Sequence, residues 1–518
     1  MRNRKTLLRC LFCVTSGVLF SVAYTFTSLW ALSFFALVPF LCVVLGCNYG
    51  YFSLIKYVFL FSLGYYSILL LWMLNISVFL PFSESVSKVV LLFCTFLVGL
   101  LQGVYLCLAV FVFVKLRRNN FLDTIIFSLL FVLSEWFAEN TPFLAFPWGK
   151  AAAVVTPFTP FIQSASLFGG IFLSFLVVFI NAGLAYALLN VRSTRKALSS
   201  LGAVIIVFVI NTAYGYARIY TKKEQNQFKA MVVQGNYSGL NKWKATSSDI
   251  FKTYVKLTRE GVDKDTRLVI WPETAVPTIL TSDSTYAKEL QELSKELNTT
   301  IVAGFFMKNQ EGSKHYNALV AFCPDGTMSN AYYKQILAPF GEYFPFGENL
   351  KKLVPMLGEL IDNSSGLLFG EKTEVIYTPA GRIGGIICYE SIFTKMSLET
   401  ADEGAQIIAV ASNDSWFGES SALYQHYSHS ILRAVETGKY VLRASNTGIS
   451  AIISPNGQAI SVAQPFKQTY AKSFVYLNNE KTFFCKTGQL FILPCLAVYI
   501  IGLVRTVFFR RFGKQSKI

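Results

Sequence analysis

Hydrophobic residues dominate several long stretches of this chain, and most of these stretches lie within the first 220 residues. Each stretch is close to the ~20 apolar residues that a helix needs to cross the hydrocarbon core of a bilayer. The stretches lie at about residues 6–25, 28–46, 55–79, 89–114, 121–138, 161–190, 199–219 and 488–509. The pattern therefore predicts a polytopic α-helical membrane domain with eight spans.

The region between the seventh and eighth stretches has a different pattern, in which short β-type runs alternate with amphipathic segments. The β-type runs lie at residues 230–233, 268–271, 300–305, 318–322, 383–387, 407–411 and 449–454. Apolar residues recur at helical spacing, with charged residues opposite, over residues 249–262, 286–297 and 420–437. This alternation predicts a single α/β domain of about 260 residues. We therefore expect a membrane domain over residues 1–220, the α/β domain over 221–485, and a C-terminal membrane helix with a basic tail over 486–518.

The positive charges of the chain follow the predicted spans. The formal net charge is +16, from 46 Lys and Arg against 30 Asp and Glu. The basic residues that flank the membrane gather before the first span, in alternate loops and after the last span: Arg2, Arg4, Lys5, Lys56, Lys115, Arg117, Arg118, Arg192, Arg195, Lys196, Arg510, Arg511, Lys514 and Lys517. Loops rich in Lys and Arg stay in the cytoplasm. We therefore expect both termini in the cytoplasm and the α/β domain on the outer face, and the charge requires no nucleic-acid partner.

The cysteines and histidines offer little for a disulfide framework or a metal site. Of ten cysteines, only Cys323, Cys388 and Cys485 lie in the polar region, without paired or CxxC spacing. The chain has three histidines, and two of them, His426 and His429, share a predicted helix at a spacing that places them on one side. No third ligand is apparent beside them, so we expect no metal.

One β-type run, residues 383–387, ends abruptly at Cys388. A strand that ends in a nucleophile at the start of a turn exposes the sulfur, and it leaves the next backbone N–H free to bind an oxyanion. The alternative is a buried core cysteine, which is the commoner situation for a cysteine considered alone.

Two further polar residues, Glu273 and Lys334, also lie at the ends of β-type runs. Considered singly, Glu273 could cap a turn and Lys334 could be a solvated strand end. Together with Cys388 they meet a chemical need, because a thiol must lose its proton before it attacks a carbonyl. With histidine scarce, a carboxylate partly buried beside Trp271 and Pro272 can act as the base, since burial raises its pKa. A lysine can then stabilise the oxyanion that forms.

Short motifs surround these residues in order along the chain. They are VQGN (233–236), WPET (271–274), LAPFGEYFPF (337–346), CYE (388–390), SNDSWFG (412–418), LRA (442–444) and NTGIS (446–450). With the enclosing spans, they resemble the nitrilase (carbon–nitrogen hydrolase) superfamily and, within it, the apolipoprotein N-acyltransferase family. The resemblance covers essentially the whole chain. It implies that the α/β domain is a nitrilase-like αββα sandwich.

The resemblance also assigns roles to individual residues. It implies that Cys388 is the nucleophile, Glu273 the general base and Lys334 the oxyanion stabiliser. The residues that it implies at supporting positions and at the substrate entrance are Glu342, Tyr389, Glu390 and Trp243. Glu342 has a second interpretation as a surface turn residue.

The sequence departs from the family pattern at the substrate entrance. The family usually has a glutamine shortly after VQGN, whereas this chain has Ser-Gly-Leu at 238–240. The aromatic residues Phe340, Phe344 and Phe346 suit a lid that faces the membrane, although a buried loop could have the same composition. Glu135, in the fifth span, is either a functional group at membrane depth or a polar contact between helices.

The family chemistry is a two-step acyl transfer. Cys388 would attack the sn-1 ester of a membrane phospholipid, and the thioester would pass the acyl chain to the α-amino group of the diacylglyceryl-cysteine of an apolipoprotein, the final step of lipoprotein maturation. The resemblance thus implies a monomeric enzyme without cofactor in the bacterial cytoplasmic (inner) membrane. Its partners would be phospholipid, diacylated apolipoprotein and the lipid bilayer.

Two other classes of protein have to be weighed against this one. A membrane-tethered nitrilase-type amidase, hydrolysing a small extracytoplasmic amide, would use the same three residues, but eight spans exceed what a tether needs. A transporter or receptor with a catalytically inactive domain would have no need to keep all three residues.

Overall fold

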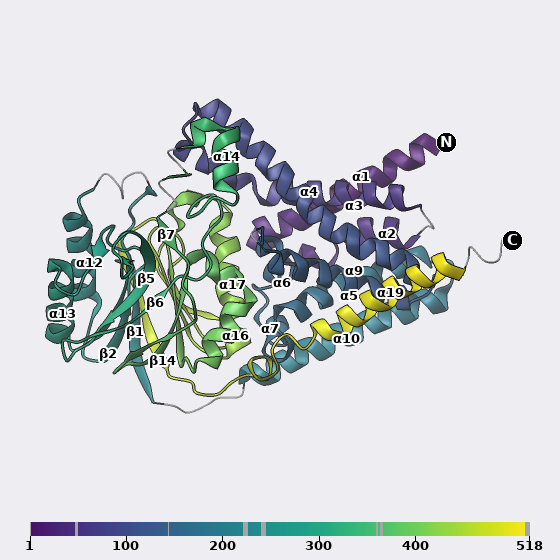
Figure 1. The fold of residues 1–518 in the computed structure, drawn as a ribbon. Coiled ribbons are helices and arrows are strands. Elements are labelled where there is room, and N and C mark those ends of the chain that lie inside the picture. The colour runs from purple at the N-terminus through teal and green to yellow at the C-terminus, as the bar shows by residue number, and fades with distance from the viewer. Residues whose placement is uncertain are drawn as a thin grey trace. The chain divides into compact units, whose positions relative to one another are not determined.

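The computed structural model describes residues 2–46, 50–142, 144–220, 226–239, 245–358, 361–362 and 366–512, and the chain divides into two compact units (Figure 1). The first, the helical unit, comprises Met1–Ser77, Ser83–Thr221 and Thr487–Ile518. The second, the α/β unit, comprises Val78–Phe82 and Lys222–Lys486. The short segment Val78–Phe82 thus packs with the α/β unit, although its neighbours on both sides belong to the helical unit.

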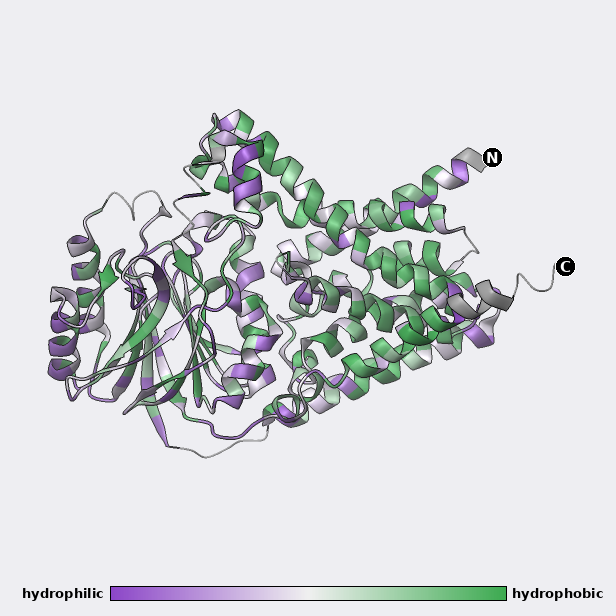
Figure 2. Cartoon of the chain, viewed as in Figure 1, coloured by the Kyte–Doolittle hydropathy of each residue, from purple (hydrophilic) through white to green (hydrophobic). Residues whose placement is uncertain are grey.

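The helical unit is built from apolar helices. Its longer elements are α1 (Arg2–Thr25), η1 (Thr27–Phe34), α2 (Val38–Gly46), α3 (Tyr51–Leu69), η2 (Leu71–Phe79), α4 (Glu84–Leu116), α5 (Leu122–Asn140), α9 (Gly170–Leu189), α10 (Thr194–Tyr220) and α19 (Ile492–Phe512). Hydrophobic residues cover most of their length (Figure 2). Among the described residues, six segments are long and apolar enough to cross a membrane: Arg4–Thr25, Thr27–Gly46, Tyr51–Leu69, Glu84–Leu116, Gly170–Leu189 and Thr194–Tyr220.

The predicted count of eight spans is therefore not confirmed. Helix α5 contains Asp123, Glu135 and Glu139 within its 19 residues, and the apolar part described for α19 is only Ile492–Arg505. The predicted stretch 161–190 is also interrupted, because Gly169 adopts a φ of 76° between α8 (Ala165–Phe168) and α9. A run of apolar residues does not reveal such a break when the residue that makes it is itself small.

Two helices of this unit approach each other closely at glycines. A Cβ added to Gly17 of α1 would lie 2.3 Å from the carbonyl oxygen of Phe61, and one added to Gly64 of α3 would lie 2.6 Å from that of Val14. Any side chain at either position would push the two helices apart. Small residues at such crossings are typical of helices that pack in lipid.

The segment after α5 is irregular and depends on side chains for its hydrogen bonds. It contains η3 (Pro147–Gly149) and α6 (Ala151–Val154), which are buried. Tyr65 donates to the carbonyl of Gly149 at 3.1 Å, and Glu135 accepts from the N–H of Ala151 at 2.8 Å. Irregular backbone among apolar helices is tolerated only where such partners exist. Glu135 is thus a polar contact between α5 and this segment.

The α/β unit contains two β-sheets. The first has the order β14-β1-β2-β4-β5-β6, with β3 beside β4 and β7 beside β5, and the second has the order β13-β12-β11-β10-β9-β8. The first sheet consists of β14 (Thr469–Tyr476), β1 (Gln227–Gln234), β2 (Thr266–Ile270), β4 (Thr300–Lys308), β5 (His315–Phe322), β6 (Met328–Tyr333), β3 (Ile279–Leu280) and β7 (Leu367–Leu368). The second consists of β13 (Ala459–Val462), β12 (Ala451–Ile453), β11 (Val441–Ser445), β10 (Ile407–Ser412), β9 (Gly381–Ile387) and β8 (Val375–Thr378).

Helices cover the outer face of each sheet, which gives an αββα sandwich (Figure 1). Helices α12 (Ser247–Gly261) and α13 (Thr285–Leu297) pack on the first sheet, and α16 (Thr394–Asp402) and α17 (Ala422–Thr437) on the second. The N-terminus of α12 is capped by Thr246, whose side chain accepts from the N–H of Asp249. Its apolar face, with Ile250, Phe251 and Tyr254, joins the buried core of the first sheet.

Strand directions bring several strand ends to common edges. Strand β2 is parallel to β4, and β6 runs in the same direction because β5 is antiparallel to both β4 and β6. The segments after β2 and β6 therefore leave the first sheet at one edge, where antiparallel β5 begins. In the second sheet, β9 and β10 are parallel neighbours, so the segments that follow them also leave together.

Candidate active site

Cys388 occupies a strained position at the end of β9. The short 3-10 helix η5 (Cys388–Ile392) begins there, and Cys388 itself has a φ of 52°. This left-handed region favours glycine. Any other residue in this conformation costs of order 1–3 kcal/mol, which the surrounding structure has to offset. The residue as a whole is half-buried. The strand therefore ends in Cys388 at the start of a turn, as predicted.

Lys334 is the cation of the site and follows β6 directly. Its Nζ lies 2.8 Å from Oε1 of Glu273 and 2.8 Å from Oε1 of Glu342, and its side chain is 1% exposed. Burial alone would lower the pKa of Lys334, but the carboxylates of Glu273 and Glu342 raise it well above its ordinary value. The ammonium group therefore stays charged.

Glu273 lies at the edge reached by the chain after β2. Its Oε1 accepts from Nδ2 of Asn317 at 2.7 Å as well as from Lys334, and its Oε2 accepts from the N–H of Asn413 at 3.0 Å. The close approach of β4 to this segment requires Gly304, where a Cβ would lie 2.5 Å from the carbonyl oxygen of Pro272. Glu273 is thus held by both sheets, because Asn413 follows β10.

Glu342 belongs to the loop after Lys334 and is tied back to it. Besides Lys334, it accepts from the N–H of Ala338 at 2.7 Å and from Nδ2 of Asn317 at 3.3 Å. These contacts give it a place in the site rather than on a surface turn.

Glu390 is buried, and four donors surround its carboxylate. Oε1 accepts from the N–H groups of Gln335 and Ile336, at 2.5 and 3.1 Å, and Oε2 accepts from the N–H of Ile387 at 2.7 Å and the hydroxyl of Tyr332 at 2.8 Å. Burial raises the pKa of Glu390 to about 7, against these hydrogen bonds. Glu390 therefore joins the segment after Lys334 to the strand that ends at Cys388.

The thiol of Cys388 experiences opposing influences. Burial, followed by the charges of Glu273 and Asp414, raises its pKa well above the ordinary value, while Lys334 and a hydrogen bond with Ser412 lower it. The resting thiol is therefore protonated at neutral pH. A base must remove its proton as it reacts, and Glu273 is the nearby carboxylate that influences it most.

A second polar group lies near Cys388. His426 of α17 lies with Nδ1 2.9 Å from Oδ1 of Asp414, and Oδ2 of Asp414 accepts from Arg443 at 2.7 Å. Sequence reasoning found no third ligand beside His426, yet ligand atoms of Cys388, Asp414 and His426 lie within 4.8 Å of one another. Because Asp414 also accepts from the hydroxyls of Ser412 and Ser445, its oxygens are occupied within the protein.

Two protein families match separate parts of the chain. The family described as carbon-nitrogen hydrolase matches residues 229–475, and the apolipoprotein N-acyltransferase N-terminal domain matches residues 16–183. The apolipoprotein N-acyltransferase of Geobacter metallireducens is 30% identical over 68% of this chain and 68% of its own length. The chain belongs to the apolipoprotein N-acyltransferase family. The Haemophilus influenzae apolipoprotein N-acyltransferase is 28% identical over 97% of this chain and 95% of its own length.

Membership of the apolipoprotein N-acyltransferase family makes this chain an acyltransferase of lipoprotein maturation and a multi-pass membrane protein. It confirms the predicted combination of apolar membrane helices with a nitrilase-like αββα sandwich. The solved structure of Saccharomyces cerevisiae Nit3, a member of branch 10 of the nitrilase superfamily, aligns at 18% identity over 52% of this chain and 96% of that chain, with a TM-score of 0.39.

The remaining predicted site residues lie in different surroundings. Tyr389 is buried, with its ring centroid 5.2 Å from that of Phe393. In the loop after Lys334, Phe340 and Phe346 are 56% and 66% exposed, whereas Phe344 is half-buried against Phe340. Trp243 lies outside the described residues.

Sequence reasoning missed Asn317, Asn413 and Asp414 as members of the site. Asn317 had a signal, because it is a polar residue within an apolar strand, HYNALVAF. Asn413 and Asp414 stand in the SNDSWFG motif, but the motif does not show that they reach Glu273 and His426.

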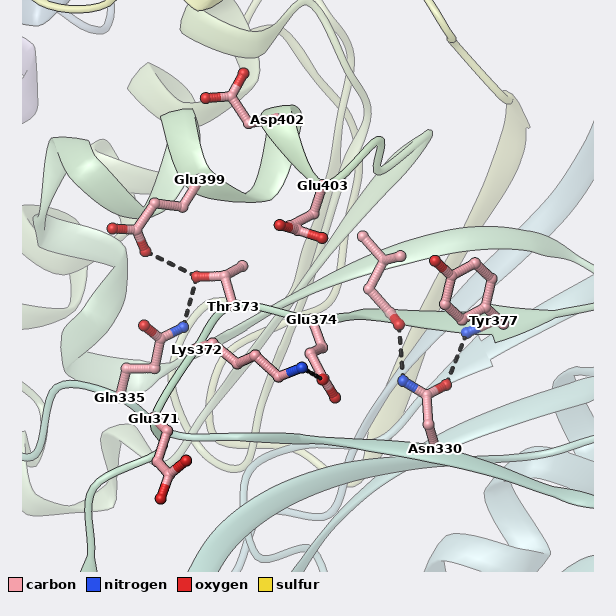
Figure 3. Close-up of a pocket in the computed structure, with 11 residues that line it drawn as sticks. Asn330, Gln335, Glu371, Lys372, Thr373, Glu374, Tyr377, Glu399, Asp402 and Glu403 are labelled. Atoms are coloured by element: carbon pink, nitrogen blue, oxygen red, sulfur yellow. Dashed lines mark hydrogen bonds and ion pairs between the residues drawn. The ribbon is translucent and has the colours of Figure 1, made fainter.

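A cavity of about 870 Å³ in the α/β unit lies apart from this chemistry (Figure 3). Its lining is acidic, with Glu371, Glu374, Glu399, Asp402 and Glu403, and it includes none of Glu273, Lys334 and Cys388. Gln335, which follows Lys334, is one of the lining residues, and its side chain donates to Thr373 at 2.6 Å. Volume alone therefore does not locate the active site.

Proposed function

We propose that Cys388 carries the acyl chain as a thioester, that Glu273 is its general base, and that Lys334 stabilises the oxyanion. The observation that carries the proposal is the buried Lys334, which forms ion pairs with Glu273 and Glu342 and lies close enough to Cys388 to influence its thiol. Glu342 and Glu390 hold the lysine and the loop that follows it. The match of residues 16–183 to the N-terminal domain of the acyltransferase family favours acyl transfer over hydrolysis of a small amide.

In the first half-reaction, the sulfur of Cys388 attacks the carbonyl carbon of the sn-1 ester of a phospholipid while Glu273 takes the thiol proton. The oxyanion faces the ammonium of Lys334, which is already charged. The intermediate collapses with cleavage of the ester C–O bond. The leaving oxygen takes the proton from Glu273, which gives a lysophospholipid and an acyl-thioester.

In the second half-reaction, the α-amino group of the diacylglyceryl-cysteine of an apolipoprotein attacks the thioester. A C–N bond forms, the C–S bond breaks, and the proton lost by the amine passes through Glu273 to the sulfur. A thioester suits this step because it is activated toward amines, provided that water is kept away.

The proposed location follows from the loop charges. The α/β unit lies on the outer face of the bacterial inner membrane with both termini in the cytoplasm, so that phospholipid and diacylated apolipoprotein reach it along the bilayer. The exposed rings of Phe340 and Phe346 support a lid that contacts acyl chains.

The test uses the full-length protein in detergent–phospholipid micelles with an acyl-labelled phospholipid. Without acceptor, label should accumulate on the protein, hydroxylamine should release it, and a diacylated lipopeptide should accept it. Cys388→Ala and Cys388→Ser should carry no label, and Glu273→Gln and Lys334→Met should be labelled on the order of 10²-fold more slowly. If phospholipid never labels Cys388 while a small amide is hydrolysed in a Cys388-dependent way, the protein is a tethered amidase instead.

A further inference from the structure

The carbonyl oxygen of Cys388 has a partner that the chemistry above does not use. His426 lies with Nε2 3.0 Å from that oxygen and 2.9 Å from the hydroxyl of Ser391. We propose that His426, held by Asp414, is a positioning residue for the nucleophile, and that its Nε2–H binds the Cys388 carbonyl. The proposal rests on the role of Cys388 as nucleophile given above.

The contacts of Nε2 assign its role. A backbone carbonyl can only accept a hydrogen bond, so Nε2 is the donor in its contact with the carbonyl of Cys388. The hydroxyl of Ser391, 2.9 Å from Nε2, can accept from the same N–H.

Asp414 and Arg443 hold the other nitrogen of the ring. Asp414 is buried, and burial would raise its pKa, but Arg443 and His426 lower it well below its ordinary range. Oδ1 of Asp414 lies 2.9 Å from Nδ1 of His426, and Nη2 of Arg443 lies 3.1 Å from the same nitrogen. These contacts fix the orientation of the ring and therefore the direction of Nε2.

The ring is also close to the reacting atom. A ring nitrogen of His426 lies within 4.8 Å of the Cys388 sulfur. The hydrogen bond from Nε2 to the Cys388 carbonyl therefore acts on the residue that carries this sulfur.

The same hydrogen bond holds the backbone of the nucleophile. Cys388 has a φ of 52°, which is strained for a residue with a side chain. Its carbonyl is held by His426, from a helix that packs on the second sheet, so the strained residue is held from outside its own turn. Losing this bond would let the peptide relax and would move the sulfur.

The first experiment reads the ring directly in the wild-type protein. The chain has three histidines, so ¹⁵N-histidine labelling gives a simple spectrum, and His315→Gln and His429→Gln assign the signals of His426 by elimination. We expect Nε2 of His426 to carry hydrogen. An unprotonated Nε2 would overturn the proposal.

The second experiment separates the two contacts. A glutamine amide can take the place of Nε2, and an asparagine amide the place of Nδ1. His426→Gln keeps a donor for the Cys388 carbonyl, so its acylation rate should stay within about threefold of wild type. His426→Asn loses that donor, and its rate should fall roughly tenfold or more below wild type. His429→Gln, a buried change one turn further along α17, is the matched control.

Equal losses in His426→Gln and His426→Asn at every pH would mean that the ring only fills space, and the proposal would fail. Alkylation of Cys388 by iodoacetamide needs no phospholipid and should follow the same order of variants. If wild-type Cys388 is alkylated in that order but is never acylated by phospholipid, the proposed function fails and the positioning role stands. If acylation is normal in wild type and unchanged in both variants, only the positioning role fails.

Discussion

At the scale of single residues, the site is a set of polar side chains that hold one another in place. Lys334 binds two carboxylates, Asn317 donates to the same two, and Asn413 donates its backbone N–H to one of them. An ion pair buried to this degree does not add much to stability, but removing one partner leaves an uncompensated charge. The position of each residue of the site therefore depends on several of the others.

The raised pKa of Cys388 predicts how its thiol reacts with a small electrophile. Because burial and nearby carboxylates keep the thiol protonated at neutral pH, its alkylation rate should rise steadily with pH up to about pH 9 and reach no plateau near pH 7. Lys334→Met should slow alkylation at every pH, since the lysine lowers the thiol pKa. Mass spectrometry of the Cys388 peptide measures both rates. A plateau near neutral pH would show a resting thiolate instead.

Asn317 gives a second prediction at this scale. Asn317→Ala removes a donor to Glu273 and should slow thioester formation by about tenfold to a hundredfold. Asn317→Asp should be slower still, because a third carboxylate would face Glu273 and Glu342. Acyl-labelling rates measure the effect. Asn330→Ala is the matched control, since Asn330 bonds the carbonyl of Val375 at the cavity in Figure 3. An Asn317→Asp variant as fast as wild type would remove Asn317 from the site.

At the scale of elements, the site is made where strands of two sheets end. The first sheet supplies the ends of β2 and β6, and the second supplies those of β9 and β10. Motifs far apart in the sequence meet beside them: Asn446 of NTGIS donates to Asn413 of SNDSWFG at 3.1 Å and accepts from the N–H of Tyr237, just after VQGN. The packing of the two sheets therefore positions the proposed catalytic groups through backbone contacts as well as side-chain contacts.

Gly304 tests this alignment, because it lets β4 approach the segment that carries Glu273. In Gly304→Ala, the new Cβ would meet the backbone of Pro272 at 2.5 Å and the Cα of Glu273 at 2.9 Å. We expect a loss of about 1–3 kcal/mol in the free energy of unfolding and a much larger proportional loss of acylation. Thermal unfolding and acyl labelling measure the two effects. Gly202→Ala in α10, where a Cβ meets nothing within 4 Å, should leave acylation unchanged and should not lower the free energy of unfolding.

Elements with a clear pattern could be predicted from the sequence, and contacts between them could not. The run 383–387 with Cys388 after it corresponds to β9 and η5, and the segments 249–262 and 286–297 correspond to α12 and α13. Strand β11, VLRAS, is absent from the predicted β-type runs because an arginine interrupts its short apolar sequence. The pairing of His426 with Asp414 was missed because it depends on how α17 packs on the second sheet, which local spacing does not encode.

At the scale of the whole molecule, the chain passes between its two units four times, because Val78–Phe82 belongs to the α/β unit. Within that unit, the ring centroid of Phe79 lies 4.5 Å from that of Trp416 in η6 (Asp414–Phe417). The 3-10 helix η2 thus ends in a segment that packs on Trp416, two residues after Asp414 of the site. Hydropathy alone assigned Phe79 to a membrane span, because the sequence does not distinguish a Phe that contacts protein from a Phe that contacts lipid.

The orientation inferred from loop charges is the prediction that belongs to this scale. A reporter fused near residue 350 should be active only outside the cytoplasm, and one fused after residue 517 only inside it. Paired alkaline phosphatase and fluorescent protein fusions measure the two locations. Both reporters on one side would contradict the charge argument, and a fusion after residue 192 provides a cytoplasmic control.

The position of Lys334 between two carboxylates has one further consequence, for reagents that acylate amines. Such reagents attack only the neutral amine, and Lys334 is held as a buried ammonium whose pKa is well above that of an ordinary lysine. Treatment of the membranes with an N-hydroxysuccinimide ester at pH 8 should therefore modify exposed lysines such as Lys372 and leave Lys334 untouched. Phospholipid labelling of Cys388 should survive this treatment, and Glu342→Gln, which removes one of the two anions, should make it sensitive.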